Sequence, residues 1–354
     1  GCHRGYVVNN LTTNSTSNWV SNIVSGSLMC QAAMYGDGSG EPDETVLTGA
    51  LFKEYDLIEK GFGRDGGYGE PNGYYAFTMD GLSEALPAVE RVFGIDMSSR
   101  IDGSYAELVW AGNIEKKYTC YYGKSSGELR PLTRWAWLLP KYNDPLLGWF
   151  YSYLKSGETF MDAIYDTETV PRKDPFGENP VRVFRDIGTT VFKSGWGAED
   201  FIFVMRTGPF YNHQFMDQGS FWLGDYGEFF IERRHGSTEP YLGAVLYEPS
   251  YIQPVSHSTI LIDRNPQSQR TGDTREFAEG FEDRAAITHF LDGGFAAFSS
   301  GDIGKLYWGK VASMQRNVLY IKPRTILMLD TVTPAGKDVD VSMLYQTLRL
   351  GDIT

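Results

Sequence analysis

The sequence predicts a helical domain followed by an antiparallel β-sandwich, and three observations support this architecture. Apolar residues recur with a period close to 3.6 from about Asn18 to about Asp166, whereas the period changes to two after about Pro171. The 354 residues exceed the usual length of one domain, which is roughly 100 to 200 residues. Because runs of helices followed by runs of strands form separate layers or domains, we expect a helical domain over 1–170 and a β-sandwich over 171–354.

The predicted helices carry recognisable starting and stopping residues. DETVLTGALFKEYDLIEKG begins with acidic residues and ends at Gly61, as helices with a complemented dipole do. AFTMDGLSEALPAVERVFG contains Pro87, which predicts a kink or a division into two helices. In chain order, the helical segments are 19–36, 43–61, 76–94, 133–142 and 145–166.

The second half consists of short β-branched or aromatic runs separated by Gly, Asp, Asn or Pro, which is typical of strands in an antiparallel sheet. RNVLYIKPRTILMLDTV predicts two strands joined at Lys322, Pro323 and Arg324. The expected strand segments are 189–195, 199–208, 219–234, 258–264, 285–293, 294–302, 316–332 and 341–348.

Composition excludes several classes of function. A formal net charge of −13 argues against a nucleic-acid-binding protein, which needs basic patches to neutralise phosphates. Cys2, Cys30 and Cys120 form no CxxC pair and no zinc-site spacing. No run of 18 or more apolar residues is present, so we expect no membrane span, and the opening GCHRGYVVNN lacks the apolar core of a signal peptide.

Two helical-domain motifs contain residues suited to chemistry. In SNW, Ser17 or Asn18 has the residue type of an N-cap, whereas Trp19 suits a core anchor; alternatively, Asn18 turns its amide into a cleft. RDGGYGEPNGYYAF predicts a loop that concentrates proton-carrying groups, or a structural loop with aromatic plugs. Its candidate groups are Asp65, Tyr68, Glu70, Tyr74 and Tyr75.

Two further motifs lie in the strand-rich half. In GPFYNHQFMDQGSFWLG, His213, Phe215 and Asp217 alternate as in a strand, and residues 220–223 continue that pattern. His213 is either a structural histidine satisfied by the backbone or a catalytic group. In SHSTILID, His257 precedes a regular strand pattern.

Taken in order, SNW, DGGYGEPNGYY, NHQFMDQGSFWLGDYGE, SHSTILID and VLYIKPRTILMLDTV resemble the heparinase II/III-like polysaccharide lyases, which include alginate and glycosaminoglycan lyases. The resemblance covers most of the chain and implies a helical α/α toroid followed by an antiparallel β-sandwich. About 150 residues precede the sandwich, fewer than a full toroid needs. We therefore expect further helices before residue 1 in the complete protein.

The resemblance implies β-elimination of a uronic-acid polymer. The substrate carboxylate must be neutralised before a base removes the poorly acidic C5 proton, and an acid then protonates the departing O4. By the matched motifs, Asn18 neutralises the carboxylate, Tyr74 or its neighbour Tyr75 carries a proton, and His213 serves either task. A second proton carrier could come from Tyr241, Tyr247 or Tyr251. We expect substrate contacts from Trp19, Arg64, Glu70, Tyr211, Gln214 and Tyr247.

Members of the family often bind a divalent metal such as Zn, Mn or Ca in the sandwich. Here the candidate ligands are His257, Glu232 and Asp217. Phe215 replaces the second histidine of the family's HxHxD motif, and a phenyl ring cannot coordinate a metal. The sequence therefore predicts no certain cofactor.

We thus expect an enzyme that binds and cleaves an anionic polysaccharide, in the periplasm or outside the cell where such polymers are met. Two alternatives belong to other classes. One is an inactive carbohydrate-binding or scaffold homologue, which the loss of the metal-position histidine favours. The other is a glycoside hydrolase that uses Glu70 with a partner such as Asp65.

Overall fold

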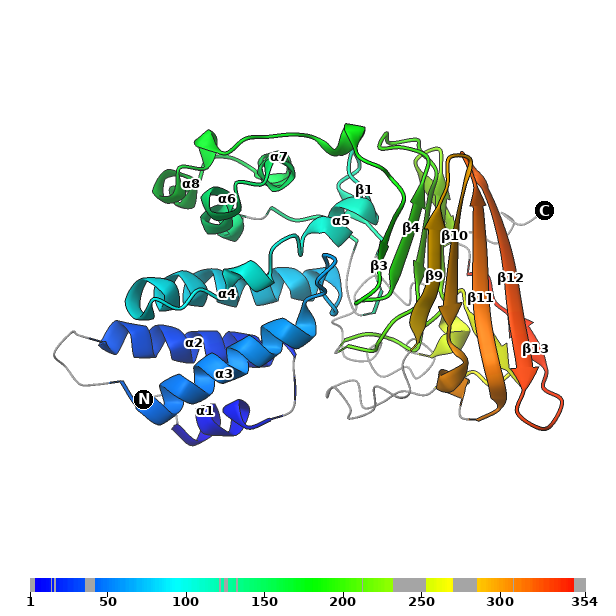
Figure 1. The fold of residues 1–354 in the computed structure, drawn as a ribbon, viewed down its shortest axis with the longest axis horizontal. Coiled ribbons are helices and arrows are strands. Elements are labelled where there is room, and N and C mark those ends of the chain that lie inside the picture. The colour runs from blue at the N-terminus through cyan, green and yellow to red at the C-terminus, as the bar shows by residue number, and fades with distance from the viewer. Residues whose placement is uncertain are drawn as a thin grey trace.

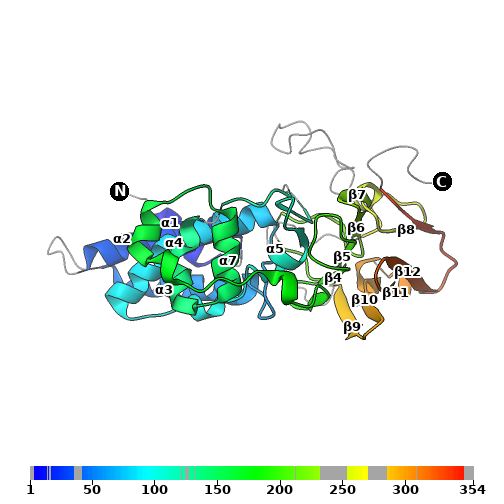
Figure 2. The same cartoon turned by 90° about the horizontal axis from the view of Figure 1, so that it is seen from above.

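The computed structural model combines helices at one end with antiparallel sheets at the other (Figures 1 and 2). The residues that it describes are 4–13, 15, 17–35, 42–120, 122–123, 127–131, 133–211, 213–231, 253–269, 285–307 and 309–346. Within these ranges, no helix is long and apolar enough to cross a membrane.

Among the described residues, the three longest helices lie within the first 93 residues, and the helices after residue 93 are shorter than those three. The α-helices are α1 (Arg4–Leu11), α2 (Asn18–Met34), α3 (Glu44–Gly61), α4 (Asn72–Phe93), α5 (Ala106–Trp110), α6 (Leu138–Tyr142), α7 (Pro145–Leu154) and α8 (Phe160–Tyr165). Short 3-10 turns occupy Ser98–Arg100, Thr133–Trp137, Thr167–Thr169, Pro175–Gly177, Pro254–Ser256 and Gly304–Tyr307.

The apolar stripe of α2 packs against α3 and α4, as the 3.6-residue period requires. Val24 and Leu28 are fully buried in this core beside Leu82 of α4. The Asp43 side chain accepts hydrogen bonds from the backbone N–H groups of Thr45 and Val46, which fixes the start of α3. These contacts hold the first turns of α2 and α4 together near the sheets.

The sequence predicts a kink or a break at Pro87, but α4 is one helix from Asn72 to Phe93, so Pro87 does not divide it. It also begins four residues before the predicted segment. Leu86 and Val89, on either side of the proline, are almost completely buried. Their packing outweighs the missing backbone hydrogen bond, which costs about 3 kcal/mol in an isolated helix.

The second half forms two large antiparallel sheets. One has the order β3-β4-β5-β6-β7 and the other the order β12-β11-β10-β9, while β1 pairs with β2 and β8 with β13. The bounds are β1 (Gly112–Asn113), β2 (Tyr118–Thr119), β3 (Arg182–Phe184), β4 (Thr189–Lys193), β5 (Ile202–Arg206), β6 (Phe221–Asp225), β7 (Glu228–Ile231), β8 (Ile260–Ile262), β9 (Ala286–Asp292), β10 (Ala296–Asp302), β11 (Val311–Ile321), β12 (Thr325–Pro334) and β13 (Val341–Met343). The β11–β12 pair turns at residues 322–324, as predicted.

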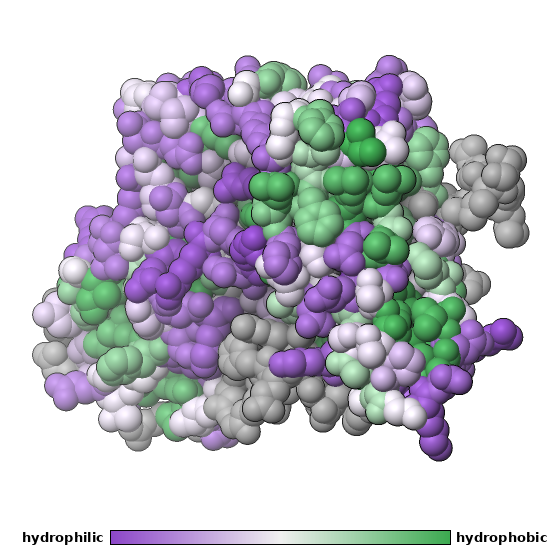
Figure 3. All heavy atoms as spheres, turned by 45° about the vertical axis from the view of Figure 1, so that its right-hand side comes forward, coloured by the Kyte–Doolittle hydropathy of each residue, from purple (hydrophilic) through white to green (hydrophobic). Residues whose placement is uncertain are grey.

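The two large sheets pack through aromatic side chains. Phe192 of the five-stranded sheet lies against Tyr320 of the four-stranded sheet, with ring centroids 5.4 Å apart. The opposite face of the four-stranded sheet exposes Leu291, Leu327 and Leu329. Figure 3 brings this side of the molecule forward and shows apolar side chains among polar ones.

Loops after α3 and α5 attach the helical part to the sheets. Asp65 accepts hydrogen bonds from the backbone N–H groups of Arg185 and Asp186, and Asp186 accepts one from the backbone of Arg64 at 2.8 Å. The buried ammonium of Lys193 in β4 donates to the Gly112 carbonyl at 2.8 Å. These bonds join the loop after α3 to the turn between β3 and β4, and the strand after α5 to β4.

Glu54 generates a testable prediction about stability. It is fully buried in the helical core, and Ser21 donates a hydrogen bond to it at 2.7 Å. Burial raises the pKa of its carboxyl to about 8 from an ordinary 4.5. The folded state therefore holds a proton that the unfolded state releases, so this group costs stability as pH rises from about 4.5 towards 8.

We expect Glu54→Gln to remove that part of the pH dependence and to stabilise the protein near pH 8 by on the order of 4 kcal/mol relative to wild type. Urea unfolding of both proteins at pH 5 and pH 8 measures the difference. If the free energy of unfolding of Glu54→Gln differed from that of wild type by the same amount at pH 5 and at pH 8, the prediction would be contradicted.

Candidate active site

The segment around His213 is a loop and not the strand that its alternation predicts. It connects β5 to β6, and turns close within it: the N–H of Gln214 donates to the Tyr211 carbonyl at 3.3 Å, and that of Ser220 to Asp217 at 2.9 Å. His213 has a φ of 62°, in the left-handed region that a strand cannot contain. The strand begins only at Phe221, so the prediction for 213–219 is wrong and that for 221–223 is confirmed.

The loop between α3 and α4 lies directly against this segment. Gln214 is buried and donates from Nε2 to the carbonyl of Gly69, while its Oε1 accepts from the N–H of Tyr211 at 3.2 Å. A Cβ at Gly69 would lie 2.1 Å from the ring of Tyr211, so only glycine allows this approach. The contact sets Glu70, the next residue, opposite His213.

Glu70 contacts two residues that are far from it in the sequence, Asn18 and His213. Its Oε1 accepts from the backbone N–H of Asn18 at 2.7 Å, and its Oε2 accepts from Asn18 Nδ2 at 2.5 Å. Oε2 also lies 2.7 Å from His213 Nδ1, which is 3.1 Å from Asn18 Nδ2. Beneath the carboxylate, the hydroxyl of Tyr68 approaches Oε1 at 3.4 Å. Glu70 and Asn18 are buried, whereas the side chain of His213 is 22% exposed.

Tyr74 completes the cluster from the first turn of α4. Its ring stacks on the imidazole of His213 with centroids 3.6 Å apart and planes 7° from parallel. Tyr75 points into the helical core, where its hydroxyl bonds to Ser104 at 2.7 Å, and burial raises its pKa above the ordinary value. Between the two predicted tyrosines, the structure therefore brings Tyr74 to His213.

The other expected substrate contacts lie in different surroundings. Trp19 is 44% exposed beside Asn18, so it is not the core anchor that its residue type suggests. The side chain of Arg64 is exposed and pairs with Glu59 at 3.5 Å. Tyr211 and Gln214 are buried and hold the loop. Four candidates lie outside the described residues: Glu232, Tyr241, Tyr247 and Tyr251.

The candidate metal ligands fit a metal poorly. Asp217 and His257 are both buried and line one small pocket, with the ring of Phe215 centred 5.6 Å from that of His257. In the part of the chain that the structure describes, no three His, Cys, Asp or Glu side chains gather as metal ligands would.

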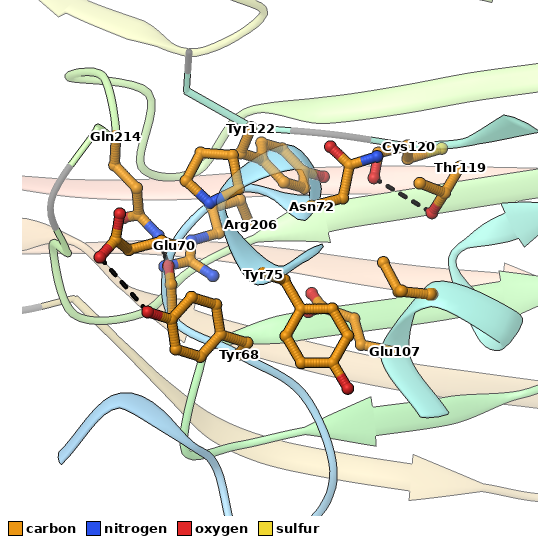
Figure 4. Close-up of a pocket in the computed structure, with 13 residues that line it drawn as sticks. Tyr68, Glu70, Asn72, Tyr75, Glu107, Thr119, Cys120, Tyr122, Arg206 and Gln214 are labelled. Atoms are coloured by element: carbon orange, nitrogen blue, oxygen red, sulfur yellow. Dashed lines mark hydrogen bonds between the residues drawn. The ribbon is translucent and has the colours of Figure 1, made fainter. Parts of the chain in front are cut away.

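A pocket on the far side of Glu70 contains two groups that the sequence patterns do not reveal (Figure 4). Arg206 is buried with its Nε lacking a hydrogen-bond partner among the described residues, and Glu107 accepts from Thr189 at 2.6 Å. Burial raises the pKa of Glu107 to about 7. The cavity of about 30 Å³ has room for roughly one or two water molecules. No motif marks either residue, because each lies in an ordinary helix or strand pattern.

Comparisons with known proteins identify the fold. No family model and no curated protein sequence matches the chain. A solved heparinase III with methylated lysines matches at a TM-score of 0.66 and 14% identity, over 98% of this chain and 49% of that one. Another heparinase III matches at 0.61 and 12% identity, over 90% and 47%, and heparan sulfate lyase HepC from Pedobacter heparinus at 0.55 and 15% identity, over 88% and 45%.

The resemblance predicted from the sequence is thus confirmed in fold: the chain has the mixed helical and antiparallel-sheet architecture of solved heparinase III structures. It spans about half the length of those structures.

Gln214 supplies a test of how the site is held together. We expect Gln214→Ala to destabilise the protein by about 1 to 3 kcal/mol, because it leaves the Gly69 carbonyl and the Tyr211 N–H unsatisfied in a buried place. Urea unfolding measures the loss, with Gln267→Ala at an exposed loop position as control. If both variants matched wild type, the two bonds would not hold the loop.

Proposed function

We propose that the protein is a polysaccharide lyase that cleaves a uronic-acid-containing chain by β-elimination. We also infer that its helices form part of an α/α toroid, over residues 1–170, and that its packed sheets form a β-sandwich, over residues 171–354. The observation that carries the proposal is the convergence of Asn18, Tyr74 and His213, from three separate motifs, at the junction of helices and sheets.

The chemistry needs two proton carriers within reach of one sugar residue. The rings of Tyr74 and His213 are stacked with centroids 3.6 Å apart, and both side chains are partly exposed, so one sugar residue could reach both. Imidazole and phenol can remove the C5 proton and supply a proton to the departing O4. β-Elimination does not consume water, so the site needs no second carboxylate to activate a water molecule.

The C5 proton becomes acidic enough only when the neighbouring carboxylate is neutralised. Asn18 is the candidate for this role, because its amide nitrogen lies 3.1 Å from the histidine ring. The Asn18 amide also donates a hydrogen bond to Glu70. A substrate carboxylate bound there would therefore share the amide with Glu70 or replace Glu70 as its acceptor.

The glycoside hydrolase alternative fits the geometry less well. Such enzymes need two carboxyl groups facing one glycosidic bond. Glu70 faces Asn18 and His213, whereas Asp65 binds the backbone at Arg185 and Asp186. The inactive binding-protein alternative is separated from a lyase by the assay below.

For the substrate, the similarity to heparinase III and heparan sulfate lyase structures makes heparan-type chains the first polymer to test, followed by hyaluronan, chondroitin and alginate. Since such polymers are met outside the cytoplasm, we propose a periplasmic or secreted location.

We expect the protein to raise ultraviolet absorbance on at least one of these polymers, as unsaturated uronate ends accumulate. Tyr74→Phe and His213→Ala should each lower kcat by about 10²- to 10⁴-fold, the usual contribution of a proton-transferring group. Tyr226→Phe, at an exposed turn, is the matched control and should keep full activity. Release of saturated ends only would rule out β-elimination, and glycan binding without turnover would favour the binding protein.

A further inference from the structure

We infer that Glu70 is a positioning residue: its carboxylate fixes the proton of neutral His213 on Nδ1 and so leaves Nε2 as the atom that accepts a proton. This inference rests on the proposed function for its catalytic meaning, but the contacts that carry it belong to the protein alone. From the sequence, Glu70 was expected as a substrate contact or, in the glycoside hydrolase alternative, as a catalytic carboxylate.

The Glu70 carboxylate determines which of the atoms around it must carry a hydrogen. An ionised carboxylate only accepts hydrogen bonds, so each close neighbour must present a hydrogen to it. Its close neighbours include the backbone N–H of Asn18, the amide of Asn18 and Nδ1 of His213, at 2.7, 2.5 and 2.7 Å, beside the more distant hydroxyl of Tyr68 at 3.4 Å. The first two are donors by nature. His213 Nδ1 is the one neighbour whose proton depends on the tautomer.

The two tautomers of neutral His213 differ in the contact that Nδ1 makes with Glu70. With the proton on Nδ1, the ring donates a charge-assisted hydrogen bond to Glu70, which is among the stronger kinds. With the proton on Nε2, the Nδ1 lone pair would face the carboxylate oxygen at 2.7 Å, and the contact from Asn18 Nδ2 that would favour this tautomer is longer, at 3.1 Å. The Nδ1–H tautomer is therefore the stable one.

The start of α2 holds the Glu70 carboxylate in place. Ser17 occupies the N-cap position of α2, but its side chain caps no backbone N–H group of the helix. Glu70 instead accepts from the first N–H of the helix, where the helix dipole favours negative charge. One oxygen is thereby anchored to α2, and the other is held towards the imidazole.

This arrangement makes Glu70→Gln an unusually informative change. The amide of glutamine has the same shape but one donating end. If its NH₂ faces His213, it donates to Nδ1 and drives the proton to Nε2; if it faces the other way, it opposes the backbone N–H of Asn18. In either orientation, the glutamine amide loses at least one of the hydrogen bonds that the Glu70 carboxylate accepts.

The test is two-bond nitrogen–proton correlation NMR of protein labelled with ¹⁵N-histidine, with the His213 signals assigned by their absence in His213→Gln. In wild type we expect the protonated-nitrogen signal at Nδ1 and the unprotonated one at Nε2. In Glu70→Gln we expect the two to exchange or to average. Glu107→Gln, the same substitution in the pocket behind Glu70, should leave the pattern of wild type.

An Nε2–H tautomer in wild type would overturn the inference without any variant having to fold, and so would an unchanged pattern in folded Glu70→Ala, which offers Nδ1 no carboxylate oxygen. If a lyase substrate is found, Glu70→Gln should lower kcat at least about tenfold with a smaller change in KM. If no polymer is cleaved while the NMR result holds, the proposed function fails and the positioning role of Glu70 stands.

Discussion

The carboxylate of Glu70 is the constraint on which the candidate site depends. It is buried and meets the start of a helix, an asparagine amide and an imidazole at hydrogen-bonding distance. A buried carboxylate is costly unless several donors satisfy it. The surrounding loops therefore have to bring those donors to it, and in doing so they assemble the groups that chemistry would use.

The same requirement explains the unusual backbone of the two loops. Gly69 allows Tyr211 to lie against the chain beside Glu70, and His213 takes a left-handed conformation inside the turn that Tyr211 and Gln214 close. A Cβ at Gly123 would lie 2.3 Å from the carbonyl oxygen of His213, so a third loop limits where that residue can move. Such departures from easy geometry gather where a site is formed, and here they surround one imidazole.

The sequence predicts the regular elements well, because their signals are local. The cores of α2 and α3 and the β11–β12 pair follow from periodicity and turn residues. It fails where the outcome depends on distant contacts. The alternation at His213 carries no information about a positive φ, and the choice between Tyr74 and Tyr75 depends on α4 starting at Asn72. The partners of Glu70 lie 52 and 143 residues away, beyond any local pattern.

The long separations within the site also bear on the order in which the protein folds. Asn18 and His213 touch across 195 residues of chain, whereas the helices on one side and the hairpins on the other close through much shorter loops. Contacts of large sequence separation are reached late, because the entropy of closing a long loop must be spent before they form. The geometry of the candidate site is therefore among the last features to appear during refolding, and the contact between Asn18 and His213 should form after the secondary structure.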